Sequence, residues 1–476
     1  MIPTSRKRLL LAAVWAATLV IGCAPPDAGR EERLAGAYLR LLAAEDARPD
    51  AGSDLITIIE ATRSSVVFLR RTAVRALGRL EQPVLVDEIA PFLNDPVASV
   101  RAEAANALAQ AVHGRDDDLI LDALLERVAI EPDSLVLAAL ARSLGRSSTS
   151  TPARARASAA LIELSVTPTG DAPLATLVGV TLGFESLVRR ARGQGLSRNA
   201  AARLIELAGY GAGEYLSEDF ARVRSLALSA LGQARRLDRG LLDQAIQDRE
   251  VSVRLVATRH LDAVPPGQRT ELIRRILTGR SLPVALEALR RIALEPRDRP
   301  YCVHLLGFAA PNIPAALRVT ALDALSRPCP QIEEQRRTLA LVASGIDSVS
   351  FDGWHAPAHA LVSLAQLSPD DAAELLPRFV SASDPFVRAY AARAARALRD
   401  AEVLRALTSD PVANVRTAAI EGLFALEGHG IDDVLLAQLD GDDPQLLLTT
   451  ARLLEGSPRG LDASSGSRCS HRGLTI

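Results

Sequence analysis

Apolar and polar positions alternate along this chain with the period of a helix. After Asp95 and Pro96, the apolar residues Val100, Ala104 and Leu108 recur every four positions. This spacing places their side chains in one stripe along a helix. An aspartate is a favourable N-cap, and a proline fits the first turn, where its missing N–H costs nothing. We therefore expect a helix that is capped by Asp95, begins at Pro96 and buries the stripe.

The same pattern returns many times. The segment "DPVASVR" at Asp95 recurs almost unchanged as "DPVANVR" at Asp410. Further copies, followed at four positions by an alanine and at eight by a leucine, begin at Leu69, Val223, Val253 and Leu317. Weaker copies, which often lack the arginine or the capping aspartate, begin at Val136, Leu174, Val284, Ala356, Val387 and Leu447. Most starts lie 28 to 39 residues apart. A period in this range indicates stacked supersecondary units.

A second helical run with leucine periodicity precedes most copies, as in "LILDALLERVA" and "AAELLPRFV". Each unit is therefore expected to be a helix, a short turn and a second helix. One such pair cannot bury its apolar face alone, so neighbouring pairs must stack. The pattern predicts one elongated all-α array instead of three separate domains.

The composition agrees with packed helices and excludes several classes of function. Hydrophobic residues make up 48% of the chain but aromatic residues only 3%, which favours close-packed helices over β-sandwiches or barrels. The 55 basic and 57 acidic side chains nearly cancel, so no net field draws in nucleic acid. Lys7 is the single lysine. A phosphate-binding P-loop and Schiff-base chemistry both need a lysine in the site, and both are excluded.

Two of the copies, "NDPVASVRAEAANALA" and "SDPVANVRTAAIEGLF", carry a family resemblance. They resemble HEAT repeats, in particular the short, armadillo-type bacterial form also called the phycobilisome-lyase HEAT-like repeat. The resemblance covers roughly residues 55–455. It implies a right-handed α-solenoid, or superhelix, of about twelve short helix pairs. HEAT arrays serve as scaffolds, adaptors and occasionally parts of enzymes, so the resemblance specifies the fold better than the function.

The amino terminus has the pattern of an export signal. The basic segment "SRKR" precedes an apolar run at Leu9–Ile21, which is shorter than the roughly 20 residues of a membrane-spanning helix but suits a signal peptide. The next residues, "VIGC", resemble the lipobox of bacterial lipoproteins. This implies cleavage after Gly22 and lipid attachment to Cys23, and several lipid chains on one residue give stable anchoring. An ordinary secretory signal with an incidental cysteine, or an uncleaved anchor, remains the alternative.

These features divide the chain into four parts. We expect a signal peptide at residues 1–22, and a lipidated cysteine with a flexible tether (residues 24–32) and a first helix at 23–50. The repeat solenoid follows at 51–456 and a low-complexity tail at 457–476. The lipobox implies a bacterial cell-envelope location, on the periplasmic or extracellular face of a membrane. Ala24 after the cysteine mildly favours the outer membrane where the cell has one.

A narrower resemblance covers residues 41–80. They resemble the start of bacterial lipoproteins in which a HEAT array precedes a cyclophilin-type peptidyl-prolyl isomerase domain. Nothing after Leu454 can form the eight-stranded barrel of that domain. The tail "GSPRGLDASSGSRCSHRGLTI" is either a solvated end or the product of a frameshift or premature end that removed the isomerase. We assign no catalytic residue to it.

The arginines of the motif occupy equivalent places, so stacking should align them in a ladder. They are Arg70, Arg101, Arg224, Arg254, Arg318, Arg388 and Arg416. In HEAT proteins such arginines bond the turn aspartate of the same or a neighbouring repeat, a role that the resemblance implies for Asp95, Asp248, Asp384 and Asp410. A charge near a buried seam needs such a partner. The alternative is a row of donors for acidic peptide partners.

The most basic local segment is "LVRRARGQGLSRNAAARL". It contains Arg189, Arg190, Arg192, Arg198 and Arg203. A solvated loop and helix face is the interpretation we favour, and a docking patch is the alternative.

Two further residue pairs are candidate sites. Cys302 and Cys329 lie on either side of one predicted helix pair, and an exported chain could join them in a disulfide or keep them as buried thiols. His355 and His359, with Asp352 nearby, have a spacing that could hold a metal on one helical face. Proline interrupts that pair and no glutamate follows the first histidine, so we favour a helical turn with a packed tryptophan and expect no metal or other cofactor.

The sequence therefore predicts a non-enzymatic, membrane-anchored extracytoplasmic scaffold or adaptor that binds protein. Its binding surface would be formed mainly by the second helices, whose exposed polar positions include Glu103, Asn106, Arg259, Asp323, Thr417 and Glu421. We expect neither a nucleic-acid partner nor a small-molecule substrate. The alternative function is a client-binding, chaperone-like module for a peptidyl-prolyl isomerase whose cyclophilin domain is missing or separate. A HEAT-like DNA glycosylase would need a basic, cytoplasmic chain, which the charge balance and the signal oppose.

Overall fold

The computed structural model describes residues 28–457, except 114, 116–117, 169, 194–195, 212–217, 280, 295–300 and 348–352. Within these residues the protein is an all-α solenoid, as the repeat pattern predicts. Its contacts divide it into two units, with unit 1 ending at Leu237 and unit 2 beginning at Asp238. Cys23, the expected signal peptide at 1–22 and the tail from residue 458 lie outside the described residues.

Unit 1 begins with a single helix and continues as helix pairs. Its helices are α2 (Ala28–Asp46), α3 (Ser53–Ala61), α4 (Val67–Arg79), α5 (Val86–Ile89), α6 (Ala98–Ala111), α7 (Asp118–Ile130), α8 (Ser134–Ser147), α9 (Thr151–Leu164), α10 (Leu174–Arg190), α11 (Arg198–Ala208) and α12 (Glu218–Gln233). Short 3-10 turns flank α5 at Pro83–Leu85 and Ala90–Asn94. The two-residue strands β1 (Val166–Thr167) and β2 (Gly170–Asp171) pair antiparallel after α9.

Unit 2 consists of helix pairs throughout. Its helices are α13 (Arg239–Ala245), α14 (Val251–Arg259), α15 (Pro266–Thr278), α16 (Leu282–Leu294), α17 (Cys302–Phe308), α18 (Ala315–Ala324), α19 (Ile332–Ser344), α20 (His355–Leu367), α21 (Pro369–Val380), α22 (Pro385–Leu398), α23 (Ala401–Leu407), α24 (Ala413–Glu427), α25 (Asp432–Gln438) and α26 (Pro444–Leu453). Three 3-10 turns lie at Leu261–Ala263, Gly345–Asp347 and Gly428–Ile431.

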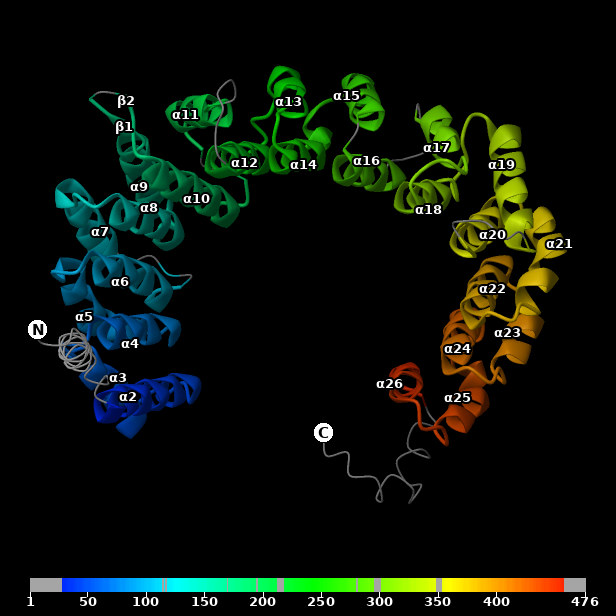
Figure 1. Ribbon diagram of the computed structural model, residues 1–476, viewed down its shortest axis with the longest axis horizontal. Coiled ribbons are helices and arrows are strands. Elements are labelled where there is room, and N and C mark those ends of the chain that lie inside the picture. Colours follow the sequence, from blue (N-terminus) through cyan, green and yellow to red (C-terminus); the bar gives the residue numbers. More distant parts are fainter. Residues whose placement is uncertain are drawn as a thin grey trace, which may run out of the picture. The chain divides into compact units, whose positions relative to one another are not determined.

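The second helix of each pair packs on the second helix of the next. In unit 1 the order is α4, α6, α8, α10 and α12, and in unit 2 it runs from α14 through the even-numbered helices to α26. Figure 1 shows α14, α16 and α18 in one layer and their partners α13, α15 and α17 in the other. The described residues contain five pairs in unit 1 and seven in unit 2, in agreement with the expected number.

Small residues explain how closely the second helices approach. Val100, Ala104 and Leu108, the predicted stripe of α6, are fully buried. Between α8 and α10 the backbones almost touch, because a Cβ added to Gly145 would lie 2.1 Å from the carbonyl oxygen of Gly183. Burying one leucine or valine contributes about 1.5–3 kcal/mol. The alanine-rich stripes thus serve the packing of helices at short distance.

The predicted helix start, with Asp95 as N-cap and Pro96 as first residue, is wrong by two residues. Helix α6 begins at Ala98, and Val97 is its N-cap with an extended backbone. The Asp95 carboxylate accepts instead from the Val97 N–H at 2.8 Å, which closes a local turn before the helix. The copy at Asp410 does the same, with α24 beginning at Ala413. The carboxylate stays outside the helix because a neighbouring arginine binds it, as described below.

Two other details differ from expectation. Helix α2 begins at Ala28, inside the segment 24–32 that was expected to be a flexible tether. The β1–β2 hairpin was not anticipated. None of the described helices has the length and apolar character needed to cross a lipid bilayer.

Candidate functional site

The motif arginines bind the turn of their own repeat. Nη1 of Arg101 donates to the carbonyl oxygen of Asp95, six residues earlier, at 3.0 Å. The same spacing recurs in the bonds from Arg70 to Ser64, from Arg254 to Asp248, from Arg388 to Ala382 and from Arg416 to Asp410. Carbonyl oxygens in tight turns have no hydrogen-bond donor from a helix backbone. Each of these arginines donates a hydrogen bond to such an oxygen.

Four of these arginines also reach the following repeat. Nε and Nη2 of Arg70 donate to the Asp95 carboxylate at 2.8 and 3.2 Å. Arg388 holds Asp410 in the same way, at 2.7 and 3.0 Å. The other two links run from Arg101 to Glu131 and from Arg416 to Gln438. A two-pronged guanidinium–carboxylate pair is among the stronger polar contacts in proteins, so these bonds join consecutive repeats.

The pairing holds these carboxylates in their charged form. The bonds from Arg388 lower the pKa of the Asp410 carboxyl below its usual value, although burial opposes them. Burial raises the pKa of Asp95, but the bond from Arg70 and the Val97 N–H outweigh it and the net shift is downward. Both aspartates are therefore ionised at neutral pH, and each pairs with an arginine at the contact between consecutive repeats.

Glu131 is a ladder residue that the sequence template missed. Burial raises the pKa of its carboxyl, but hydrogen bonds from Arg101, the Asp133 N–H and Arg127 lower it to about 2. Its side chain is fully buried. The signal was present in "EPDSLV", because Glu131 stands five residues before the stripe residue Val136, as Asp95 stands before Val100. The sequence analysis considered only aspartates as partners of the motif arginines, so it did not include this glutamate.

The remaining ladder residues bind locally. Arg224 donates to the Tyr210 carbonyl and Arg318 to the Ala309 carbonyl. Asp248 accepts from the Glu250 N–H, and Asp384 caps α22 by accepting from the Phe386 N–H. The expected arginine–aspartate pairs are thus formed by the Asp95 and Asp410 side chains, whereas the Asp384 side chain serves as a helix cap.

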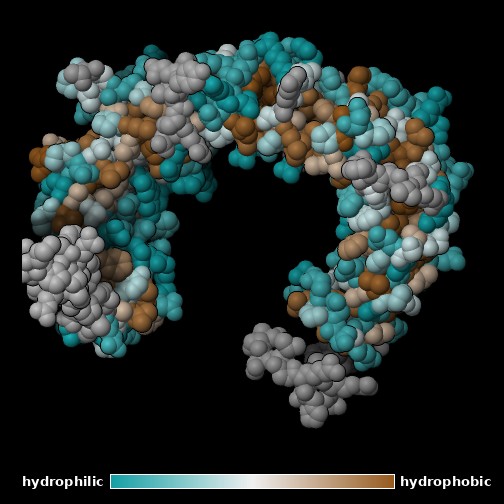
Figure 2. Space-filling model, in the orientation of Figure 1, coloured by the Kyte–Doolittle hydropathy of each residue, from teal (hydrophilic) through white to brown (hydrophobic). Residues whose placement is uncertain are grey.

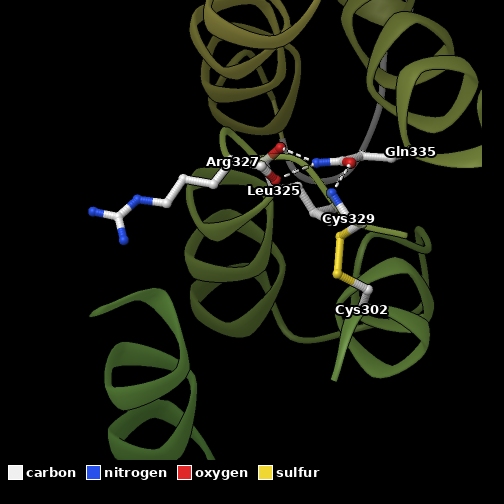
Figure 3. Close-up of a disulfide and its surroundings, with 5 residues drawn as sticks. All are labelled: Cys302, Leu325, Arg327, Cys329 and Gln335. Carbon is white, nitrogen blue, oxygen red and sulfur yellow. Dashed lines mark hydrogen bonds between the residues drawn. A yellow bond between two sulfur atoms is a disulfide. The ribbon is translucent and has the colours of Figure 1, made fainter. Parts of the chain in front are cut away.

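Cys302 and Cys329 form a disulfide in unit 2 (Figure 3). Their Cα atoms lie 5.9 Å apart. Cys302 begins α17, and Cys329 follows α18, so the bond fastens both helices of one pair. The fully buried Gln335 accepts from the Cys329 N–H at 2.8 Å and donates to two carbonyls in the same turn. The bond and this glutamine together fix the connection to α19.

His355 and His359 do not converge on a common point. His359 Nδ1 lies 2.6 Å from the Asp323 carboxylate, and its Nε2 lies 2.7 Å from the Tyr390 hydroxyl. The exposed His355 ring instead stacks on Trp354, with ring centroids 3.9 Å apart. Asp352 is outside the described residues. Among the residues that are described, no three histidine, cysteine, aspartate or glutamate side chains gather as metal ligands.

The rings around Trp354 form what we call the aromatic cluster: Trp354, His355, Phe386 and Tyr390. Phe386 stacks nearly parallel to Trp354 at 5.7 Å, and Tyr390 lies tilted against it at 5.6 Å. Arg393 lies over the Tyr390 ring at 4.5 Å. The cluster brings together the amino-terminal ends of α20 and α22. It is unusual in a chain with 2 tryptophans and 5 tyrosines.

A surface pocket of about 420 Å³ adjoins the aromatic cluster. Trp354, Ile346 and Val387 supply apolar lining, and Arg378 and Asp384 supply opposite charges. Phe386 is 51% exposed. Tryptophan, tyrosine and arginine are the side chains most enriched at binding hot spots, so this region has the composition of a protein-binding site.

The basic segment at 187–203 divides into separate environments. Arg203 donates to Ser165 at 2.8 Å and pairs with Asp171 and Glu206, so it anchors the β1–β2 hairpin. Arg192 and Arg198 are exposed. Arg189 and Arg190 lie in the last turn of α10, where Arg189 pairs with Glu185 and Arg190 contacts His113.

Part of the sequence matches a family of helical repeats, in agreement with the helix pairs of the structure. Residues 52–169 match the family model of HEAT repeats. A search of curated protein sequences found no match. The matched residues lie in unit 1, include α3 through α9, and contain the links from Arg70 to Asp95 and from Arg101 to Glu131.

Solved structures give a weaker likeness. Importin β is 14% identical, over 88% of this chain and 60% of its own, with a TM-score of 0.49. The corresponding values for Kap121p are 13%, 95%, 57% and 0.45. An engineered protein is 18% identical, over 85% of this chain and 98% of its own, with a TM-score of 0.31. This chain thus spans less than two thirds of either natural protein, and no functional conclusion is drawn from them.

Proposed function

We propose that this protein is a non-catalytic scaffold that binds other proteins on its repeat surface and is held at a membrane of the cell envelope by lipid on Cys23. The observation that carries the binding role is the aromatic cluster beside the pocket on α20 and α22. Phe386 stacks on Trp354 across two helix pairs and still leaves 51% of its surface exposed, so it offers a rigid aromatic anchor to a partner.

The repeat architecture supports this function. Arginine–carboxylate bonds and alanine stripes hold the stack together internally, which leaves the outer positions of the second helices available for recognition. On the face that Figure 2 shows, hydrophobic residues are interspersed among hydrophilic ones in both units. A partner would therefore be bound by several small contacts along the repeats, with the aromatic cluster as one of the strongest.

Crosslinking and affinity capture from membranes of the native host test the binding role. Phe386→Ala should lower recovery of a defined envelope partner by about fivefold or more, the effect of a binding hot spot. Phe68→Ala is the matched control, since Phe68 is 48% exposed and stacks on Tyr38 in unit 1. Equal recovery by both variants would contradict the proposed site. A broad spread of unfolded exported proteins would favour the chaperone-like alternative.

Metabolic labelling with a lipid precursor tests the anchor. The wild-type chain and the Cys469→Ala variant should both take up label and stay with the membrane fraction. Cys23→Ala should lose the label, because the thiol is the attachment point that the lipobox implies. Unchanged labelling of Cys23→Ala would refute the lipid anchor while leaving the protein-binding role untouched.

A further inference from the structure

Four arginines come together where α8 packs on α10, and we call them the arginine cluster: Arg142, Arg146, Arg189 and Arg190. Glycines bring the two helices close enough, since Gly145 meets the Gly183 backbone and Gly179 meets Ala138. Arg142 and Arg146 are one turn apart and so share a face of α8. Arg189 and Arg190 end α10 beside them.

Among the described residues, no carboxylate holds the cluster with two hydrogen bonds as Asp95 holds Arg70. Nε of Arg142 is buried without a hydrogen-bond partner. Burial lowers the pKa of the Arg146 guanidinium, and the charges of Arg190, Arg142 and Arg189 lower it further, with only a small opposing effect from Glu81. Burial and Arg189 likewise lower the pKa of Arg190. Like charges have been gathered here at a free-energy cost, in contrast to the ladder.

The contacts that the structure describes for Arg189 and Arg190 are weak. Arg189 lies 3.7 Å from Glu185 and remains 66% exposed. Arg190 lies 3.5 Å from Nδ1 of His113. Neither contact has the two-pronged geometry by which Arg70 or Arg388 holds its aspartate. The guanidinium groups therefore keep donors that an incoming anion can use.

The neighbouring helix carries one acidic group on the same side. Burial raises the pKa of the Glu103 carboxyl on α6, and Arg75, Arg71 and Arg142 act against that rise. This glutamate therefore lies within the electrostatic reach of arginines on both α4 and α8. The Glu103 carboxylate would repel a continuous nucleic-acid phosphate backbone. A short peptide with a few carboxylates can bind the arginines beside it.

We propose that the arginine cluster binds carboxylate side chains of an acidic segment in a protein partner. The inference rests on the proposed protein-binding function and assigns it a second contact, in unit 1. Guanidinium forks match carboxylates in pairs, and the four arginines present several such forks within two neighbouring helices. The chain's net charge of −2 provides no wider field to hold nucleic acid.

Fluorescence anisotropy with a labelled peptide of eight glutamates tests the proposal on the chain that follows the signal peptide. The Arg142→Gln/Arg146→Gln variant should bind at least about tenfold more weakly, because two charge-assisted bonds are lost. The control variant Arg274→Gln/Arg291→Gln removes the same charge from exposed arginines that pair within their own helices. Its affinity should change less than about twofold. A peptide of eight glutamines should not bind.

Three results would overturn the proposal. They are the absence of binding to the glutamate peptide, equal losses in the two double variants, and tighter binding of duplex DNA or anionic vesicles through the same arginines. Circular dichroism melts of each variant separate loss of binding from loss of folding. If the peptide does not bind while partner capture still depends on Phe386, this inference fails and the proposed function stands.

Discussion

Arg101 and Arg146 are both half-buried arginines on second helices of unit 1, yet they occupy opposite environments. Arg101 donates to the Asp95 carbonyl and to the buried Glu131 carboxylate. Arg146 faces other arginines, and its pKa is lowered. The first residue joins consecutive repeats, and the second lies among like charges, where we propose that an acidic partner binds. The role of an arginine in this protein therefore depends on its position in the repeat and cannot be inferred from the number of arginines.

The largest effect is expected from Arg101→Met. The substitution leaves the Glu131 carboxylate buried with one fewer donor, and breaking such a pair should reduce the free energy of unfolding by about 3 kcal/mol. Urea unfolding followed by circular dichroism measures the loss. Arg274→Met, at an exposed position, should leave the free energy of unfolding almost unchanged. Similar losses in the two variants would remove the distinction between seam and surface arginines.

The second prediction concerns pH. The folded-state pKa of Glu131 is about 2, below the unfolded value of about 4.3, so its pairing stabilises the fold fully above the unfolded value. That stabilisation is lost as pH falls through the folded value, and it should amount to about 3 kcal/mol. Unfolding free energies of the wild type and Glu131→Gln, measured from pH 7 to pH 2.5, should converge at the acid end. A constant difference across this range would contradict the assignment.

A smaller effect distinguishes two aspartates of the predicted ladder. Asp410→Asn removes the charge held by Arg388 and should lower the free energy of unfolding by about 1.5 kcal/mol. Asp384→Asn should change it by less than about 0.5 kcal/mol, because asparagine caps a helix about as well as aspartate. Thermal unfolding of both variants checks the difference. Equal losses of stability in the two variants would mean that the Arg388–Asp410 pair contributes no more than the helix cap at Asp384.

The smallest effect should have the opposite sign. Arg146→Met removes one charge from the arginine cluster and keeps the length of the side chain, so the free energy of unfolding should rise by about 0.5 kcal/mol. The measurement is the same urea titration as for Arg101→Met. A loss of stability at this position would show that Arg146 already has a satisfied structural role.

Much of the fold could be predicted because the repeat has a strong period. The stripe at Val100, Ala104 and Leu108 located a second helix, and its copies located the rest. The start of that helix was misplaced because the sequence shows an aspartate before a proline but not the arginine of the preceding repeat that binds the carboxylate. Long-range pairing of this kind overrides local capping preference.

The candidate sites were harder to predict for the same reason. The aromatic cluster joins Trp354 to Phe386 and Tyr390 across two helix pairs, and no local pattern links them. The arginine cluster forms only because glycines let α8 and α10 approach, which places Arg146 beside Arg190. Glu131 was the exception, since its place five residues before the stripe was visible in the sequence.

One measurement separates the two kinds of arginine most directly: thermal unfolding with and without the eight-glutamate peptide. For the Arg101→Met variant we predict a lowered melting temperature that the peptide still raises. For the Arg142→Gln/Arg146→Gln variant we predict an unchanged or slightly higher melting temperature that the peptide does not raise, because a ligand stabilises only the fold that binds it. Equal peptide-induced shifts in both variants would contradict this account.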